Sequence, residues 1–197
     1  MKIKFTYSLI LLSFLFAKSF AQTYQEHLDN CVKNFSHLEQ SDSFEAFISA
    51  RDSCMIGAPL PRIKSKTLSG KQINTDNLKG KIVILNFWST TCGPCIEEMP
   101  GLNKLIDSGE HKDVVFLSFA PEKPEKLIAF LKKNVFRFEV IAESIPIAGD
   151  ILKLPGMLPY TIIVDTKGKI THMWFGGFGN ETYPTFIEFL AQVRNSS

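Results

Sequence analysis

Two cysteines separated by a glycine and a proline, Cys92 and Cys95, are the residues whose chemistry is most readily inferred. Cysteines three positions apart at a helix start share one face and lie close enough for a disulfide. Free backbone N–H groups at the helix end would favour the Cys92 thiolate and lower its pKa. We therefore expect Cys92 to attack a disulfide, and Cys95 to resolve the mixed disulfide that thiol exchange passes through.

Other uses of this cysteine pair are less consistent with the sequence. Attachment of a c-type haem requires histidine after the second cysteine, where this chain has Ile96. A structural zinc site needs four ligands, and the sequence has no second CxxC pair. A purely structural disulfide would gain little from closing so short a loop. Zinc and a structural disulfide remain as minor alternatives.

We expect no metal site and no cofactor. The histidines are scattered without the spacing of metal ligands, so each is better interpreted as a surface or hydrogen-bonded side chain. They are His27, His37, His111 and His172.

The segments around the cysteines must place them at the end of a strand and the start of a helix. Residues 82–88 are an apolar run whose length suits a strand buried on both faces. Pro94 suits the first helical position, and the acidic residues after Cys95 suit a first helical turn. Pro100 is expected to bend or interrupt this helix, which would resume over residues 102–106. A strand leading into a CxxC at a helix start is the context that redox exchange requires.

The rest of the main segment predicts alternating strands and helices. A strand over 114–120, a helix over 122–134 and a strand over 136–141 imply a parallel sheet core. Residues 161–164 and 170–175 predict an antiparallel hairpin at the sheet edge. Smaller expected elements are a hairpin over 62–67 and 71–74, a short helix over 148–154 and a closing amphipathic helix over 181–194.

From residue 58 to the C-terminus, the chain resembles the TlpA/ResA-like branch of the thioredoxin superfamily, which are extracytoplasmic thiol-disulfide oxidoreductases. The resemblance rests on the active-site stretch GKIVILNFWSTTCGPCIEEMP, on Gly-Ala-Pro at 57–59, on Leu-Lys-Gly-Lys at 78–81 and on LPYTIIVD at 158–165. It implies an α/β, thioredoxin-like fold: a central mixed sheet flanked by helices, with an N-terminal β-hairpin and a central strand-helix insertion.

The resemblance also assigns roles to individual residues. It makes Cys92 the nucleophile, Cys95 the resolving thiol and Pro159 a cis-proline whose loop packs beside the disulfide. The backbone of Leu158 would pair with the substrate chain. We further expect Met157, Leu158 and Tyr160 to form an apolar lip that holds the substrate, with Trp88 near the disulfide.

Glu98 follows Cys95 by three residues and matches a carboxylate that this branch has near its cysteines. On the same helix face, it could accept a proton from Cys95 or hold up the pKa of the attacking thiol. The alternative is a solvated first-turn glutamate like Glu97, stabilised by the helix dipole. Cytoplasmic thioredoxins have a buried aspartate where this chain has Asn86, so proton handling is expected to fall to Glu98.

The N-terminus and the charge balance bear on location and partners. Residues 1–21 have two early lysines, a short apolar stretch and small residues before the end of Ala21, as in a cleaved signal peptide. An uncleaved anchor is the alternative. The net charge is +2, and −1 without the three lysines of residues 1–21, so nothing suggests nucleic acid. We expect a periplasmic protein with no stable membrane insertion after cleavage.

Export makes the redox direction a separate question. In an oxidising compartment a reducing CxxC must be re-reduced, which implies a membrane electron donor. We expect disulfide reduction in exported proteins, whose disulfides or thiols would be the substrates. A disulfide oxidase or isomerase, a peroxide-reducing thiol enzyme and a copper or zinc carrier that binds metal through the same thiolates are alternatives.

Residues 22–57 lie outside the resemblance, so we divide the chain into 1–21, 22–57 and 58–197. Apolar residues recur at helical spacing on both sides of a polar break at 40–43, which predicts a helical hairpin whose second helix is capped by Asp42 or Ser43. Cys31 and Cys54 would lie near its open end, and a structural disulfide is favoured over free thiols or a second redox pair. The sequence gives this extension no role beyond the hypothesis of partner docking.

Overall fold

The computed structural model describes residues 22–39 and 44–196. The predicted signal peptide at residues 1–21 and the predicted helix cap at Asp42 or Ser43 lie outside the described residues. Within the described ranges, no helix is both long enough and apolar enough to cross a bilayer.

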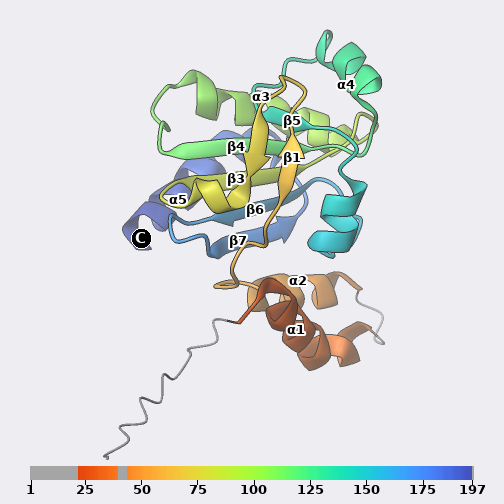
Figure 1. The fold of residues 1–197 in the computed structure, drawn as a ribbon, viewed down its shortest axis with the longest axis vertical. Coiled ribbons are helices and arrows are strands. Elements are labelled where there is room, and N and C mark those ends of the chain that lie inside the picture. Colours follow the sequence, from red (N-terminus) through yellow and green to blue (C-terminus); the bar gives the residue numbers. More distant parts are fainter. Residues whose placement is uncertain (1–21, 40–43, 197) are drawn as a thin grey trace, which may run out of the picture.

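A five-stranded mixed sheet in the order β5-β4-β3-β6-β7 forms the centre of the fold (Figure 1). Strands β3, β4 and β5 run parallel, whereas β6 is antiparallel to β3 and β7 is antiparallel to β6. This is the parallel core with an antiparallel edge hairpin that the sequence predicts. The bounds are β3 Ile82–Phe87, β4 Val114–Phe119, β5 Glu139–Ile141, β6 Tyr160–Val164 and β7 Ile170–Phe175.

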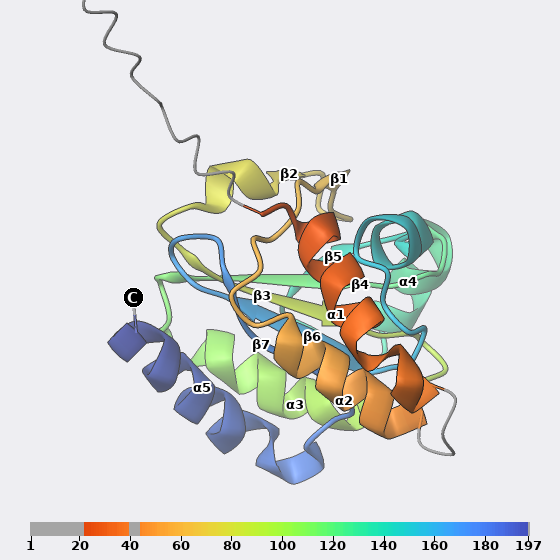
Figure 2. The same cartoon turned by 90° about the horizontal axis from the view of Figure 1, so that it is seen from below.

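Helices α3 (Gly93–Asp107) and α5 (Thr182–Ser196) lie side by side on one face of the sheet (Figure 2). Ile82 and Ile84 of β3 point to this face and pack in one apolar cluster with residues of both helices. The expected interruption at Pro100 is wrong, because α3 continues through it as one helix. Proline removes one backbone donor, and the packing of both halves of α3 on the sheet holds the helix together.

The opposite face of the sheet buries the alternate residues of β3. Val83, Leu85 and Phe87 pack with the segment that follows β5, and with Tyr24 and Leu28 of the N-terminal extension. Side chains alternate between the two faces of a strand, which is why β3 is apolar at nearly every position. The extension therefore contributes to the main core.

The extension consists of α1 (Tyr24–Glu39) and α2 (Phe44–Cys54), which pack on each other beside the β7 edge of the sheet (Figure 1). A disulfide joins Cys31 of α1 to Cys54 of α2, with the Cα atoms 5.8 Å apart. The Nε2 atom of His27 lies 2.9 Å from the carbonyl oxygen of Cys54. The two helices are thus fastened together just before the N–H of Gly57 donates to the carbonyl of Ile170 in β7 at 2.7 Å.

The smaller elements differ from expectation mainly at their ends. The expected short helix at 148–154 is instead a π-helical segment that begins two residues earlier, with a proline in its first turn. The remaining elements are β1 Lys64–Lys66, β2 Gln72–Asn74, η1 Thr75–Leu78, α4 Pro124–Leu131, η2 Pro146–Ile151 and η3 Gly179–Glu181.

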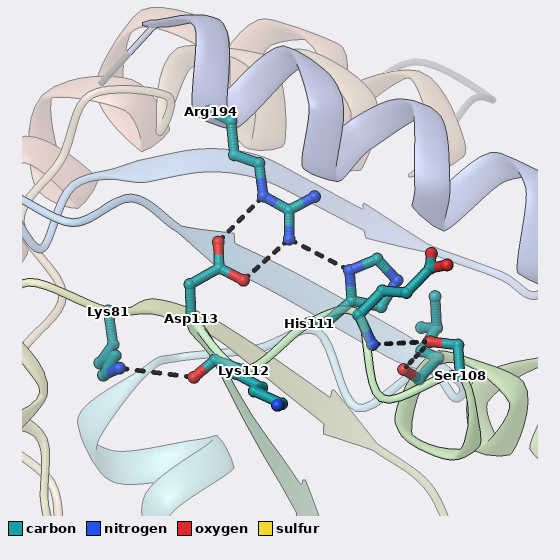
Figure 3. A network of polar contacts seen from close by, with 8 residues as sticks. Lys81, Ser108, His111, Lys112, Asp113 and Arg194 are labelled. Atoms are coloured by element: carbon teal, nitrogen blue, oxygen red, sulfur yellow. Dashed lines mark hydrogen bonds and ion pairs between the residues drawn. The ribbon is translucent and has the colours of Figure 1, made fainter.

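A polar network fastens the C-terminal helix to the loop before β4 (Figure 3). The Arg194 guanidinium donates two hydrogen bonds of 2.9 Å to the Asp113 carboxylate and one of 3.1 Å to Nδ1 of His111. A guanidinium has only donors, so Nδ1 is the acceptor and the neutral His111 ring carries its proton on Nε2. Burial, and then the Arg194 charge, lower the pKa of His111.

Candidate active site

Cys92 and Cys95 lie at the junction of the central strand and α3, joined by a disulfide with Cα atoms 5.3 Å apart. Cys92 is the N-cap of α3, and its sulfur accepts a hydrogen bond from the backbone N–H of Cys95 at 3.3 Å. Pro94 occupies the first turn, where its missing N–H costs no helical hydrogen bond. The backbone N–H of Cys95 and the positive end of the helix dipole face the Cys92 sulfur, an environment that favours a thiolate.

The two cysteines differ in their access to solvent. Cys92 is half-buried, whereas Cys95 is 1% exposed and belongs to an apolar cluster with Trp88 and Met99. A disulfide in a substrate protein can approach Cys92 but is kept from Cys95 by this packing. The arrangement suits attack by the first sulfur and resolution by the second.

Glu98 lies one turn further along α3 and is 2% exposed. Asn86 of β3 donates from Nδ2 to Oε1 of Glu98 at 2.8 Å and to the Thr161 hydroxyl at 3.2 Å. Burial raises the pKa of Glu98 to about 7, against the smaller opposing effect of the Asn86 hydrogen bond. The interpretation of Glu98 as a solvated first-turn residue like Glu97 does not fit this burial.

The cis-proline loop, residues 152–159, ends beside these groups. The Leu158–Pro159 peptide bond is cis, and the Pro159 carbonyl accepts a hydrogen bond of 2.8 Å from the N–H of Gly176. A Cβ atom placed on Gly177 would lie 3.1 Å from Oε2 of Glu98 and 3.3 Å from a ring carbon of Pro159. Glu98 and Pro159 therefore converge on one point, which Gly177 leaves free.

An apolar hollow of about 250 Å³ adjoins the loop. Met157 and Leu158, both half-buried, form part of its wall, and the exposed Ile145 stands at its rim. Leu158 also packs against the cluster that holds the two cysteines. The walls of the hollow are mostly apolar, so it suits an apolar side chain. Its lining residues include Phe87, Trp88, Phe119, Ile145, Met157 and Leu158.

The expectation that the Tyr160 side chain forms part of the substrate lip is wrong. Tyr160 is 0% exposed, and its hydroxyl accepts a hydrogen bond from Arg51 of α2 at 3.1 Å. Every residue of β6 is buried, so the side chain that follows Pro159 lies in the core. Trp88 packs with Cys95 as expected of a residue near the disulfide, but it too is fully buried and lies beneath the hollow.

Glu122 is a further residue of the site that the sequence reasoning missed. Its Oε1 atom accepts hydrogen bonds from the N–H of Thr90 at 2.8 Å and from the Thr90 hydroxyl at 2.6 Å. Burial opposes ionisation of Glu122, yet the Thr90 hydrogen bonds leave its pKa below the ordinary value. The carboxylate fixes the turn that presents Cys92. The polar run at 89–91 was the one signal of such a partner.

One group of described residues could present metal ligands together. The ligand atoms of His27, Cys31 and Cys54 lie within 4.8 Å of one another. In the disulfide the two sulfurs are bonded to each other and are not thiolates, which are the form that binds metal.

Comparisons with known proteins show the family of the chain. The model of the AhpC/TSA family matches residues 56–173, which is more than half of the chain. The chain belongs to the AhpC/TSA family. A thiol-disulfide oxidoreductase ResA of Bacillus cereus is 32% identical over 147 residues, covering 74% of this chain and 84% of that protein. Thioredoxin-like protein YneN of Bacillus subtilis is 37% identical over 125 residues, covering 61% and 71%.

Solved structures agree on the fold of this AhpC/TSA family member. A putative thiol:disulfide interchange protein DsbE of Chlorobium tepidum superimposes with a TM-score of 0.62 at 19% identity, covering 70% of this chain and 97% of that one. The chain thus has a thioredoxin-like fold and is a thiol-disulfide oxidoreductase. The family match begins at residue 56, after the end of α2.

Proposed function

We propose that this oxidoreductase reduces disulfides of exported proteins through Cys92 and Cys95. The observation that carries the proposal is the unequal burial of the two sulfurs at the start of α3. A reductase of this kind needs one sulfur that a protein substrate can reach and a second that substrates cannot reach. Cys92 and Cys95 satisfy these two requirements in that order.

The reaction consists of two thiol exchanges. The Cys92 thiolate attacks one sulfur of the substrate disulfide, forming a mixed disulfide and releasing the other substrate sulfur as a thiolate. The Cys95 thiolate then attacks the Cys92 sulfur, which closes the Cys92–Cys95 disulfide and releases the second substrate thiolate. Both substrate sulfurs take up protons, and the substrate gains the two electrons that the enzyme loses.

Glu98 would handle the proton of Cys95. A carboxyl with a pKa of about 7 is divided between its two forms near neutral pH, so it can accept a proton and release it again. The burial of Glu98 on α3 supports this role, because a buried base keeps the proton away from solvent during the exchange. Asn86 holds the carboxylate in place.

The cis-proline loop and the apolar hollow would bind the substrate chain. The backbone at Leu158 is proposed to pair with an extended segment of the substrate, while Met157 and Leu158 contact an apolar side chain beside the target cysteine. Main-chain pairing supplies affinity that does not depend on the amino-acid sequence of the substrate. Substrates would thus be unfolded or flexible proteins that carry a disulfide near an apolar residue.

The proposed location is the periplasm, which the features of residues 1–21 support. There the oxidised enzyme must be reduced again, and we propose a dithiol protein of the membrane as the two-electron donor.

The test is trapping with single-cysteine variants in extracts that contain exported proteins. Cys95→Ser should accumulate mixed disulfides with its substrates, because no second thiolate is left to resolve them. Cys92→Ser should trap nothing and should fail to reduce insulin. Full insulin reduction by Cys92→Ser would exclude the proposed roles.

The direction of electron flow is tested by the midpoint potential of the Cys92–Cys95 couple at pH 7. A value at or below about −250 mV is expected for a reductase, whereas one above about −160 mV would mean that the protein introduces or rearranges disulfides. Thiol mapping must account for Cys31 and Cys54 separately.

A further inference from the structure

Two charged side chains of the N-terminal extension are buried in the body of the protein. Arg51 is 3% and Asp52 is 4% exposed, although both lie on the surface helix α2. Charged residues are almost never buried to this degree unless they are paired. Arg51 Nη2 lies 3.0 Å from Oδ1 of Asp52. The same ion pair could form on the exposed surface of α2, so it does not by itself account for the burial of both side chains.

The remaining contacts of Arg51 go to the two ends of the cis-proline loop. Its Nη1 donates to the carbonyl of Lys153 at 3.2 Å, and its Nη2 donates to the Tyr160 hydroxyl at 3.1 Å. Tyr24 of α1 adds a hydrogen bond of 2.7 Å from its hydroxyl to the carbonyl of Leu152. The extension therefore forms hydrogen bonds just before and just after the residues proposed to bind substrate.

The bond to Lys153 acts on a strained residue. Lys153 has a φ of 49°, in the left-handed region that a residue with a side chain rarely adopts because its Cβ crowds the following carbonyl oxygen. Such a conformation persists where the surroundings hold it in place. A charged donor on the Lys153 carbonyl is a restraint of this kind.

The Cys31–Cys54 disulfide fixes α2 relative to α1. Cys54 follows Asp52 by two residues, and its bond to Cys31 ties the Arg51 segment of α2 to the helix that carries Tyr24. The loop is thus held by two helices that are cross-linked to each other.

We propose that Arg51 is a positioning residue that holds the cis-proline loop in the conformation that binds a protein disulfide. The inference rests on the proposed function, and it gives the extension the task of shaping the substrate site. Arg51 touches neither substrate nor the reacting sulfurs. Its loss should weaken reactions that depend on pairing with the loop and spare those that need Cys92 alone.

The test compares a protein disulfide with a small one. The rates at which the pre-reduced protein reduces insulin and 5,5′-dithiobis(2-nitrobenzoate) are measured well below the melting temperature, with the state of Cys31 and Cys54 verified by thiol titration. The test variant is Arg51→Met/Asp52→Asn, which leaves no buried charge unpaired.

We expect the rate with insulin to fall about tenfold in the double variant, the factor that corresponds to about 1.4 kcal/mol. The rate with the small disulfide should change less than about twofold, since it needs no pairing with the loop.

Lys153→Gly, added to the double variant, should raise the reduced insulin rate about threefold, because glycine adopts a positive φ without strain. Cys31→Ala/Cys54→Ala should also lower the insulin rate selectively.

The matched control is Ile48→Ala, which removes a buried side chain of α2 that faces β7 and not the loop. It should lower stability and leave the ratio of the two rates unchanged. Equal losses with both substrates, or a ratio shifted as strongly by Ile48→Ala, would overturn the inference while the proposed function stands. A wild-type protein that reduces neither disulfide would instead overturn the proposed function.

Discussion

Asn86 donates a hydrogen bond to Glu98 across the interior of the protein, at 2.8 Å, and so couples the central strand to the carboxylate beside the cysteines. A neutral amide can serve a carboxylate or a carboxylic acid through the same donor, and it adds no charge of its own. The pKa of Glu98 is therefore governed by burial.

The buried Glu98 should make stability depend on pH. Its pKa in the folded protein is about 7, above the ordinary value of 4.5, so the folded state binds more protons between these values. Stability from the protonated acid is fully present below pH 4.5 and is lost as pH rises to 7, by about 3 kcal/mol. Urea unfolding as a function of pH measures this slope, which Glu98→Gln should remove. An identical slope in Glu98→Gln would show that other groups cause it.

Replacing Gly177 even with alanine should disturb Glu98 or Pro159. A methyl group there would meet Oε2 of Glu98 at 3.1 Å and the Pro159 ring at 3.3 Å, so one of them must move. We expect Gly177→Ala to raise the pKa of Glu98 further, by excluding water from the carboxylate, and to slow insulin reduction several-fold. The pH profile of the rate measures both effects. A profile that coincides with that of the wild type would contradict the proposed convergence of Glu98 and Pro159.

The Cys31–Cys54 disulfide should stabilise the fold more than the active-site disulfide does. Its cysteines are separated by 23 positions, which the chain-entropy model values at about 3 kcal/mol, whereas the separation of 3 between Cys92 and Cys95 is worth about 2 kcal/mol less. Denaturant unfolding of Cys31→Ala/Cys54→Ala, with Cys92→Ala/Cys95→Ala as the matched control, measures this difference. Equal losses in both variants would contradict it.

The pKa of His111 should respond in opposite directions to the loss of the Arg194 charge and of the Asp113 charge. The Arg194 charge lowers its pKa and the Asp113 carboxylate raises it, in addition to the larger lowering by burial. Arg194→Met should therefore raise the pKa of His111 and Asp113→Asn should lower it, as followed by NMR titration. With the folded pKa below the unfolded one, the stability from neutral His111 is present above pH 6.5 and is lost as pH falls through the folded pKa. Shifts of the same sign in both variants would contradict the geometry.

The chemistry of the site could be predicted from sequence because its central parts are contiguous. Strand, turn and helix start follow one another from residue 82 to Cys95, and local patterns suffice to place both cysteines. Resemblance supplied the role of Pro159, whose sequence neighbours alone do not predict a cis bond. Glu98 required spacing and resemblance together.

The parts that escaped prediction depend on contacts between distant segments. Arg51 and Asp52 have the sequence signature of a solvated helix surface, and only the packing of α2 on the sheet brings them inside. Tyr160 was expected in an apolar lip with Met157 and Leu158, but β6 is buried at every position. Thr90 and Glu122 are 32 residues apart, and no local pattern joins them.

The hydrogen bond from Tyr24 to Leu152 spans 128 residues and has a consequence for the order in which the chain folds. During synthesis α1 and α2 emerge first, but the surface that they cover does not exist until β6 and β7 have been made. Cys31 and Cys54 precede Cys92 in the chain, so in an exported protein they would reach the oxidising compartment first and could pair with each other before the reactive cysteines arrive. Although α1 and α2 come early in the chain, they can dock only after β6 and β7 have formed, and the proposed substrate site would be completed by that late step.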